Sequence, residues 1–532
     1  MAFQPTSRMV VFGAGTTAEA LPQEFGNKAA VLVKMASLGI PVPPGFALGV
    51  TICDDYYRNN EVLPDYVDEM LKRGISHLEK ATGLTFGSGR RPLLVSVRSG
   101  APISMPGIMD TMLNIGLNRE IIQGLIYMSG NPRFAWDTYR RYLENFGTIV
   151  LGYEGSKFQA ILHEIMEDVG VTDETALDFK SLKLITGRYE AMLQRNGGPK
   201  FPENVYDQLR AASIAVLRSW NSPRAANFRR LNLVGAARGT AVTVQAMVFG
   251  NMGRFSGAGV AFSRNPWTGG KELVVDYKLG AQGEDVVSGS QGASTQKEMA
   301  HLMPEAYRDL QAVATRLEQY FKDMQDIEFT VQEARLFILQ SRSGKRSPYA
   351  ALRIAVEMVD EGLITPKVAL RLLEGVDIDS IIIQRLNASG EPLGAGISAS
   401  VGVAAGRIAL TCERAEEDSA RSPVILVRET ASPDDIAGIK AAGGLLTARG
   451  ARTSHAAVVA RQMGKVCVVN CADLSIDLAR HRINIGKAML HEGDEITLDG
   501  SSGLVYAGHL STTTEKPVDL LAKVAKWRKK KT

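Results

Sequence analysis

Cysteine is scarce in this 532-residue sequence, and long apolar runs are missing. Four cysteines are too few for a disulfide framework in a chain of this length and are typical of a protein from a reducing cytosol. No apolar stretch approaches the roughly 18 residues that a membrane-spanning helix needs, and the first residues have too short an apolar core for a secretory signal. We therefore expect a cytoplasmic protein that has no membrane partner.

An excess of charge of one sign is also missing. Lys and Arg number 61 and Asp and Glu number 57, which gives a formal net charge of +4. The basic run Arg528–Lys531 supplies four positive charges, so the rest of the chain is neutral, and this argues against a nucleic-acid partner. Such a run is typical of a solvated tail, and a docking patch is the alternative.

The pattern of residues along the chain predicts several domains, and at roughly 100–200 residues per domain we expect about three or four. Residues 1–345 mix predicted strands with glycine loops and carry a helical insertion at about 115–235. Residues 346–392 read as a helical linker, 393–510 alternate strand and helix, and 511–532 form a basic C-terminal helix or tail. We therefore predict a multidomain chain of the α/β and α+β classes.

Strands are predicted where β-branched residues alternate with polar ones, as at 93–100 and 239–250. The stretch DIEFTVQEARLFILQSR, residues 326–342, has two such runs separated by a short polar turn and predicts a hairpin. A Gly/Ala-rich stretch at 393–407 is typical of a flexible joint into the next domain.

The segment LLTARGARTSHAAVVARQMGK, residues 445–465, is the most informative short stretch. It predicts a short strand, a turn at Gly450 and a helix that begins near Ser454, with Thr453 or Ser454 as N-cap. His455 would then lie in the first helical turn, where exposed N–H groups and the positive end of the helix dipole favour an anion. This setting suits a histidine that attacks phosphorus, because its phosphoryl adduct is anionic.

Two arginines flank this histidine, and Arg449 and Arg452 could neutralise the oxygens of a transferred phosphate. The alternative is a histidine in a capping region that has no chemistry. The six other histidines lie in helix-like or turn contexts that suggest no catalytic role.

Several longer motifs carry a family resemblance. TARGARTSHAAVVAR resembles the phosphohistidine signature of the phosphoenolpyruvate-utilising enzymes, and EGDEITLDGSSGLVY resembles the end of their swivelling domain. FGNKAAVLVKMASLGIPVPPGFAL, SVRSGAPISMPGIMDT, GVAFSRNPWTGG and MQDIEFTVQEARLFILQSRSGKR are similar to the nucleotide-binding region of pyruvate phosphate dikinases. The motifs follow one order over about residues 10–510, which is far more specific than one short pattern. In one departure, Ala451 follows Gly450 where the family has two glycines.

The resemblance implies an ATP-grasp nucleotide-binding domain followed by a swivelling β/β/α phosphohistidine domain. It implies that Lys28 and Arg98 contact the phosphates of ATP, and that the loop Ser99–Gly107 could close over them. The turn at Phe25 and Gly26 fits this role, because glycine allows a backbone to approach a phosphate closely.

Four further residues match the family's nucleotide-binding positions. Gln245, Met247 and Val248 match the strand that offers backbone groups to adenine. Glu284 matches a position near the ribose or the phosphates.

The predicted hairpin carries the residues that the resemblance implies for Mg²⁺. Asp326 and Glu328 are two apart in a strand and therefore face the same side, and Gln340 could meet them from the partner strand. Oxygen ligands of this kind suit Mg²⁺, and Arg342, on the same face as Gln340, could hold the γ-phosphate. The alternative is a pair of exposed carboxylates on a hairpin face.

The implied activity is that of an ATP-dependent transferase with His455, Arg98 and Arg342 as catalytic residues. His455 attacks the β-phosphorus, AMP leaves, inorganic phosphate takes the terminal phosphoryl group as pyrophosphate, and phospho-His455 passes its phosphoryl group to an acceptor bound elsewhere. The family's pyruvate-binding barrel is missing from the resemblance, so we expect a partial reaction, completed by a separate acceptor-domain protein or by a longer form of the chain.

Two alternatives stay open at this point. The chain could be a subunit of a split synthase that phosphorylates another small acceptor, or a nucleotide-sensing relative without turnover. The sequence also leaves open the final acceptor, the choice between phosphate and water for the γ-phosphoryl group, and the oligomeric state.

Overall fold

The computed structural model divides the chain into two compact units. The first unit comprises Met1–Arg254 with Phe337–Gln340, and the second comprises Phe255–Leu336 with Ser341–Thr532. The structure describes residues 8–102, 109, 111–195, 201–231, 239–283, 294–387, 390–431, 435–450, 452 and 454–529. None of the helices in these ranges combines the length and the apolar character that a membrane crossing requires.

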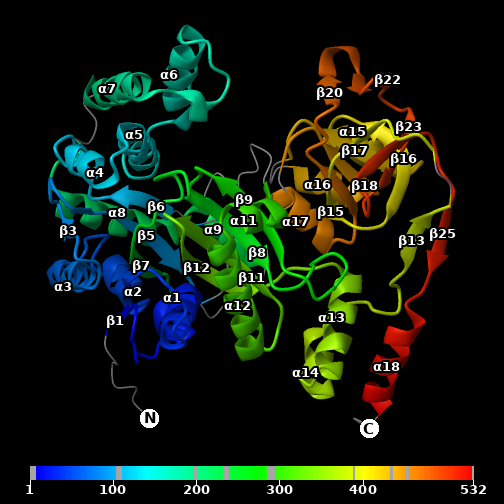
Figure 1. Cartoon of the computed structure of the whole chain (residues 1–532), viewed down its shortest axis with the longest axis horizontal. Coiled ribbons are helices and arrows are strands. Elements are labelled where there is room, and N and C mark those ends of the chain that lie inside the picture. Colours follow the sequence, from blue (N-terminus) through cyan, green and yellow to red (C-terminus); the bar gives the residue numbers. More distant parts are fainter. Residues whose placement is uncertain are drawn as a thin grey trace. The chain divides into compact units, whose positions relative to one another are not determined.

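A five-stranded antiparallel sheet forms the centre of the first unit (Figure 1). Its strand order is β1 (Met9–Phe12), β2 (Gly45–Leu48), β7 (Ala241–Ala246), β5 (Val95–Gly100) and β6 (Thr111–Ile115). A separate short parallel pair is formed by β3 (Thr85–Phe86) and β4 (Pro92–Leu93), which precede β5 in the sequence. All six residues of β7 are buried, because both neighbouring strands and the packed helices exclude water from it.

The helices of this unit pack their apolar sides into one core. They are α1 (Pro22–Ser37), α2 (Thr51–Arg58), α3 (Asp65–Thr82), α4 (Ile121–Ser129), α5 (Pro132–Ile149), α6 (Gly155–Asp168), η1 (Glu174–Ala176), α7 (Phe179–Arg195), α8 (Val205–Ser219) and α9 (Pro223–Leu231). The sequence determines their ends locally: the Asn131 side chain accepts a bond from the Phe134 N–H, and Pro132 occupies the first turn of α5. Helices α4 to α9 fall within the stretch that the sequence predicts to be helical.

The second unit begins with another antiparallel sheet, called here the nucleotide-side sheet. Its order is β10 (Ser294–Thr295), β9 (Val274–Leu279), β8 (Gly257–Phe262), β11 (Gln325–Gln332) and β12 (Arg335–Ser343). The predicted hairpin is confirmed, since Glu333 and Ala334 both have positive φ and form the tight turn between β11 and β12.

Helices of the second unit pack against this sheet and against one another. They are α11 (Gln296–Leu302), α12 (Pro304–Phe321), α13 (Pro348–Asp360), α14 (Pro366–Leu372) and α18 (Val518–Lys529). Helix α18 ends in the basic run, whose described residues Arg528 and Lys529 are exposed, and Lys530 and Lys531 lie outside the described residues. Its Val524 is buried in the core with α13, and Lys523 bonds Asp360 at 2.6 Å.

An eight-stranded sheet forms the rest of the unit, called here the C-terminal α/β body. Its order is β14 (Gly394–Ala395), β24 (Leu504–Ala507), β23 (Glu495–Asp499), β16 (Val403–Ala409), β17 (Val424–Arg428), β18 (Gly444–Thr447), β19 (Val466–Val469) and β15 (Ile397–Ser400). Strands β16 to β19 are parallel, and the crossovers between them are α15 (Cys412–Ser419), α16 (Ile436–Ala441) and α17 (His455–Gln462).

Two apolar layers enclose this sheet. One contains residues of α15, α16 and α17, and the other contains residues of a small sheet, β20 (Leu474–Asp477), β21 (Arg482–Ile485) and β22 (Ala488–His491), with η3 (Leu478–Arg480) between β20 and β21. The chain enters the body through β13 (Ile383–Leu386) and leaves it through β25 (Thr512–Glu515), which pair with each other (Figure 1). The result is the predicted β/β/α layering.

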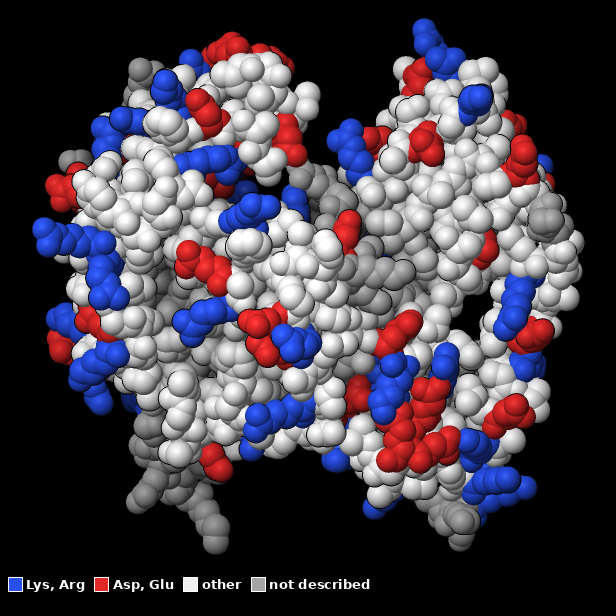
Figure 2. Space-filling model, viewed as in Figure 1, with Lys and Arg blue, Asp and Glu red and all other residues white. Residues whose placement is uncertain are grey.

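A buried ion-pair network ties α13 to the nucleotide-side sheet. Arg264 is fully buried, and its guanidinium bonds Glu318 of α12 at 2.8 Å and Glu361, at the end of α13, through two bonds of 2.9 and 2.8 Å. Figure 2 shows acidic side chains gathered beside basic ones in the region of α13 and α14. A buried charge that loses its partners costs far more than a surface charge, so Arg264 fixes where α13 lies.

We expect Arg264→Ala to lower the free energy of unfolding of the second unit by about 3–5 kcal/mol, because it leaves two acidic side chains without their buried partner. Arg414→Ala, which removes an exposed pair with Asp418, is the control and should cost less than about 1 kcal/mol. Urea denaturation followed by far-ultraviolet circular dichroism measures both. Equal losses in the two variants would contradict the role given to Arg264.

Candidate functional site

His455 is the first residue of α17, at the carboxyl end of the parallel strand β18. Ser454 is the N-cap, as predicted, and its hydroxyl oxygen accepts a bond from the Ala457 N–H at 3.4 Å. Gly450 has a φ of +138°, which only glycine adopts without strain, so the predicted turn is also present. Thr453 and the His455 side chain lie outside the described residues.

The position of this helix start follows from the packing of the body. Strands β17, β18 and β19 are almost fully buried, and the crossovers bring the loops at their carboxyl ends to one edge of the sheet. Ligands of open α/β sheets bind at this edge, and a helix N-terminus there presents unpaired N–H groups to an anion. His455 therefore lies at a helix start on the edge of the sheet where such anion-binding sites occur.

Both arginines near His455 have acidic partners. Arg449 pairs with Glu429 at 3.1 Å and is largely exposed. Arg452 forms an ion pair with Asp276 of β9, donates a second bond to the Val275 carbonyl at 3.2 Å, and lies 5.2 Å above the Trp267 ring. Burial raises the pKa of Asp276, and the charge of Arg452 opposes that rise. The segment before α17 is thus fixed to the nucleotide-side sheet.

The predicted metal-binding carboxylates lie on β11. Asp326 is buried and pairs with Arg342 of β12 at 2.9 Å through one oxygen, while its Oδ1 atom has no hydrogen-bond partner among the described residues. Burial raises the pKa of Asp326, Arg342 opposes the rise, and the neighbouring charge of Glu328 adds to it. A buried carboxylate oxygen without a partner beside a second carboxylate is the environment that a divalent cation stabilises, so these residues fit Mg²⁺.

The other predicted metal and nucleotide residues are placed as follows. Gln340 lies on β12, in the stretch Phe337–Gln340 that belongs to the first unit. Glu284 lies outside the described residues. Among the residues that are described, no group of three or more His, Cys, Asp or Glu side chains is arranged to hold a metal.

In the first unit, the two segments that carry the predicted phosphate contacts Lys28 and Arg98 approach each other closely through their backbones. Gly26 interrupts the start of α1 with a φ of +75°, and a Cβ atom built there would lie 1.9 Å from the Gly100 carbonyl oxygen. The Asn27 N–H donates to the Ala101 carbonyl at 3.0 Å. Lys28 follows directly on α1, and Arg98 lies two residues before Gly100 on β5, so glycine at position 26 allows the backbones next to both residues to meet.

The predicted adenine strand lies beside Arg98. Ser96 and Arg98 of β5 stand opposite Gln245 and Thr243 of β7. The Gln245 side chain is buried and donates to the Pro43 carbonyl at 3.0 Å, so its amide supports the sheet. Beyond the end of β7, the Met247 N–H donates to the Leu94 carbonyl at 2.9 Å. The N–H of Met247 is therefore already used within the fold.

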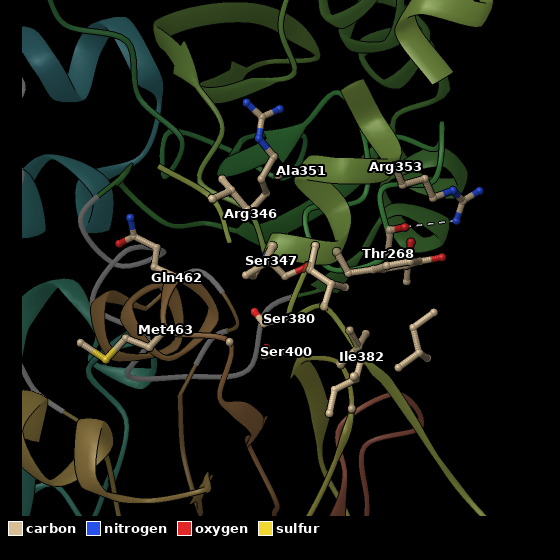
Figure 3. A pocket seen from close by; sticks show the side chains of 18 of the residues that line it. Thr268, Arg346, Ser347, Ala351, Arg353, Ser380, Ile382, Ser400, Gln462 and Met463 are labelled. Carbon is tan, nitrogen blue, oxygen red and sulfur yellow. Dashed lines mark hydrogen bonds between the residues drawn. The ribbon is translucent and has the colours of Figure 1, made fainter. Parts of the chain in front are cut away.

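A separate cavity of about 1010 Å³ lies in the second unit, where α13 begins beside the C-terminal α/β body (Figure 3). Each basic side chain on its wall already has a partner: Lys345 bonds Gln462, Arg346 pairs with Asp323, Arg353 with Glu357 and Arg385 with Glu515. None of the predicted site residues in the described part of the chain lines it. The cavity is therefore distinct from the predicted nucleotide site.

Two family models match the chain. The model described as pyruvate phosphate dikinase, AMP/ATP-binding domain, matches residues 61–295 and 290–363, and the model described as PEP-utilising enzyme, mobile domain, matches residues 420–503. The chain belongs to the pyruvate phosphate dikinase family. Both the recognised resemblance and the predicted fold class, an ATP-grasp-type domain followed by a mobile domain, are confirmed.

Curated relatives in this family are similar over nearly the whole chain. Pyruvate, phosphate dikinase of Clostridium symbiosum is 41% identical over 512 residues, which is 95% of this chain and 59% of the relative. The chloroplastic enzyme of Flaveria pringlei is 44% identical over 508 residues, covering 94% and 53%. The Rhizobium meliloti (strain 1021) enzyme is 40% identical over 534 residues, covering 97% and 59%. The chain thus spans somewhat over half the length of these dikinases.

Three residues around the mobile-domain helix escaped the sequence interpretation. Asp276 and Trp267 lie in segments that the sequence assigns only to the nucleotide-binding region, and Arg461 reads as an ordinary helical arginine. Asp276 is 176 residues from Arg452 in the chain, so no local pattern indicates that they meet. One signal could have identified Trp267. It follows closely after the predicted strand β8, and a large aromatic residue in a glycine-rich loop usually packs against another part of the protein.

Gly26→Ala should weaken ATP binding by about ten-fold or more, because the new methyl group forces the turn before Lys28 away from Gly100 and loses a charge-assisted contact. Gly15→Ala is a matched control, since Gly15 has the same φ of +75° and open space around its Cβ position. It should cost only about 1–2 kcal/mol of backbone strain and leave ATP affinity unchanged. Titration calorimetry with ATP distinguishes them. Equal affinities in the two variants would exclude the steric explanation.

Proposed function

We propose that the chain is an ATP-dependent phosphotransferase that forms phospho-His455 and passes the phosphoryl group to an acceptor bound elsewhere. The observation that supports it most directly is the start of α17 at His455, behind the Ser454 cap and at the carboxyl end of β18. Membership of the pyruvate phosphate dikinase family gives this position its chemistry.

In the first step a ring nitrogen of His455 attacks the β-phosphorus of ATP. The bond from the β-phosphorus to the oxygen bridging to the α-phosphate breaks, and AMP leaves with that oxygen. The product is a pyrophosphoryl-histidine. Inorganic phosphate then attacks the terminal phosphorus and leaves as pyrophosphate, and phospho-His455 remains with the former β-phosphorus.

The chain's own residues contribute mainly position and charge. Lys28 and Arg98 hold phosphate oxygens from the first unit, and Arg342 holds the γ-phosphate from β12. Asp326, Glu328 and Gln340 would hold Mg²⁺, which when bound draws negative charge from the phosphates. The N–H groups at the start of α17 stabilise the phosphoryl group on the histidine. Such positioning and charge neutralisation account for most of the catalysis of phosphoryl transfer.

The remaining contacts determine which nucleotide binds. The carbonyl of Met247 and the backbone of Val248 bind the adenine edge, and Glu284 contacts the ribose or the phosphates.

The names of the relatives suggest pyruvate as the final acceptor, bound at a site other than those described. The small number of cysteines favours a cytoplasmic location for this chain, whereas the plant relatives are named chloroplastic.

ATP labelled at the β- or γ-phosphorus tests this function. With inorganic phosphate present, we expect β-label on the protein, γ-label in pyrophosphate, and release of AMP. His455→Ala should lower the rate of AMP formation by about a thousand-fold or more, because the nucleophile is lost. His481→Ala, an exposed histidine paired with Glu492, is the control and should retain the full rate.

Three outcomes would reject the proposal. ATP binding without AMP formation under all acceptor conditions would indicate a nucleotide sensor. AMP formation that survives His455→Ala would place the nucleophile elsewhere. Transfer of the label from phospho-His455 to a small acceptor other than pyruvate, with pyruvate inactive, would indicate a different synthase and reject the assignment of the acceptor.

A further inference from the structure

Arg461 is a fully buried arginine one helical turn and a half after His455 on α17. Its Nη2 atom donates to the Arg452 carbonyl at 3.1 Å, but Nε and Nη1 have no hydrogen-bond partner among the described residues. A buried guanidinium with unmet donors is costly, so a fold that keeps one has a compensating interaction nearby.

Part of the compensation comes from aromatic rings of the nucleotide-side sheet. The guanidinium of Arg461 lies 5.3 Å from the centre of the Trp267 ring and 5.5 Å from that of Phe262. Phe262 ends β8, and Trp267 follows in the next loop. A cation over an aromatic face is attracted by the ring, and the attraction is larger away from water. Arg461 therefore joins the mobile domain to the sheet that carries the metal-binding hairpin.

Two buried carboxylates of the same sheet also compensate for the burial of the Arg461 guanidinium. Burial lowers the pKa of Arg461 to about 10, and Asp326 opposes this most strongly among the charged groups, with Asp276 also contributing. Each carboxylate has a buried oxygen without a hydrogen-bond partner among the described residues, Oδ1 of Asp326 and Oδ2 of Asp276. Their other oxygens are taken by Arg342 and Arg452. Asp326 stands opposite Phe262 in the register of β11 and β8, which places its strand position next to the ring that Arg461 contacts.

We propose that Arg461 is a positioning residue that holds α17 against the nucleotide-side sheet through the charge of Asp326 and Asp276, and that a divalent cation on Asp326 competes with it. The proposal rests on the metal-binding role given to Asp326 under the proposed function. One carboxylate cannot fully neutralise two cations. A divalent cation bound to Asp326 therefore weakens the attraction between Asp326 and Arg461, and Arg461 weakens the binding of the cation. By reciprocity, docking of α17 weakens the binding of the free metal by the same factor.

Hydrogen–deuterium exchange of the full chain tests this directly, read at residues 262–268 and at α17. In wild type, magnesium chloride should speed exchange at both segments relative to EDTA at equal ionic strength. Arg461→Met should speed exchange without metal by about ten-fold, since a buried cation–aromatic contact and its ionic partners are lost, and should abolish the dependence on magnesium.

Two further variants distinguish positioning from simple packing. Arg461→Lys keeps the charge and should keep the magnesium dependence of exchange. If Arg461 acted through packing alone, Arg461→Lys and Arg461→Met would respond to magnesium in the same way. Arg421→Met applies the same substitution to an exposed arginine of the mobile domain and should behave as wild type. If Arg461→Met unfolds the domain, as faster exchange in β16 to β19 would reveal, Asp326→Asn takes its place and should also abolish the magnesium dependence.

Unchanged exchange in Arg461→Met, or magnesium dependence that persists in Arg461→Met or Asp326→Asn, would overturn the proposal. The same measurement in His455→Ala separates it from the proposed function, because exchange requires no phosphoryl transfer. Magnesium-dependent exchange in a wild-type chain that releases no AMP from ATP would reject the proposed function and leave the role of Arg461 standing.

Discussion

Trp267 is the residue on which the arrangement of the second unit depends. Its indole N–H donates to the Ala399 carbonyl of the mobile domain, and its own carbonyl accepts a bond from the Ser347 hydroxyl at 2.8 Å. Arg452 and Arg461 both lie over its ring. Through its ring, its indole N–H and its backbone carbonyl, Trp267 is thus in contact with β15, with Arg452 and α17, and with Ser347 at the start of α13.

The contacts at Trp267 combine features that rarely occur together in a permanent core. They are aromatic and buried, yet they consist largely of cations and carboxylates that water or phosphate could satisfy equally well. Well-packed aliphatic side chains of similar volume would hold the same surfaces at least as strongly. Water can satisfy the charged groups of such a contact, whereas aliphatic side chains gain nothing from water.

Local structure was predictable from the sequence wherever neighbouring residues determine it. The β11–β12 hairpin follows from alternation and a short polar turn, and the start of α17 follows from the preference of serine for an N-cap. Arg461, Trp267 and Asp276 could not be recognised, because their roles arise from packing between segments that are far apart in the chain. Gly26 is intermediate: its turn was expected, whereas its contact with Gly100 is a tertiary feature.

The pairing of β13 with β25 has a mechanical consequence. These two strands are the incoming and outgoing connections of the C-terminal α/β body, and they are bonded to each other along four residue pairs from Ile383 and Glu515 to Leu386 and Thr512. Two paired strands bend less freely than two separate linkers of the same length. Any rotation of the body as a unit would therefore take place about this paired segment and would keep the body close to it.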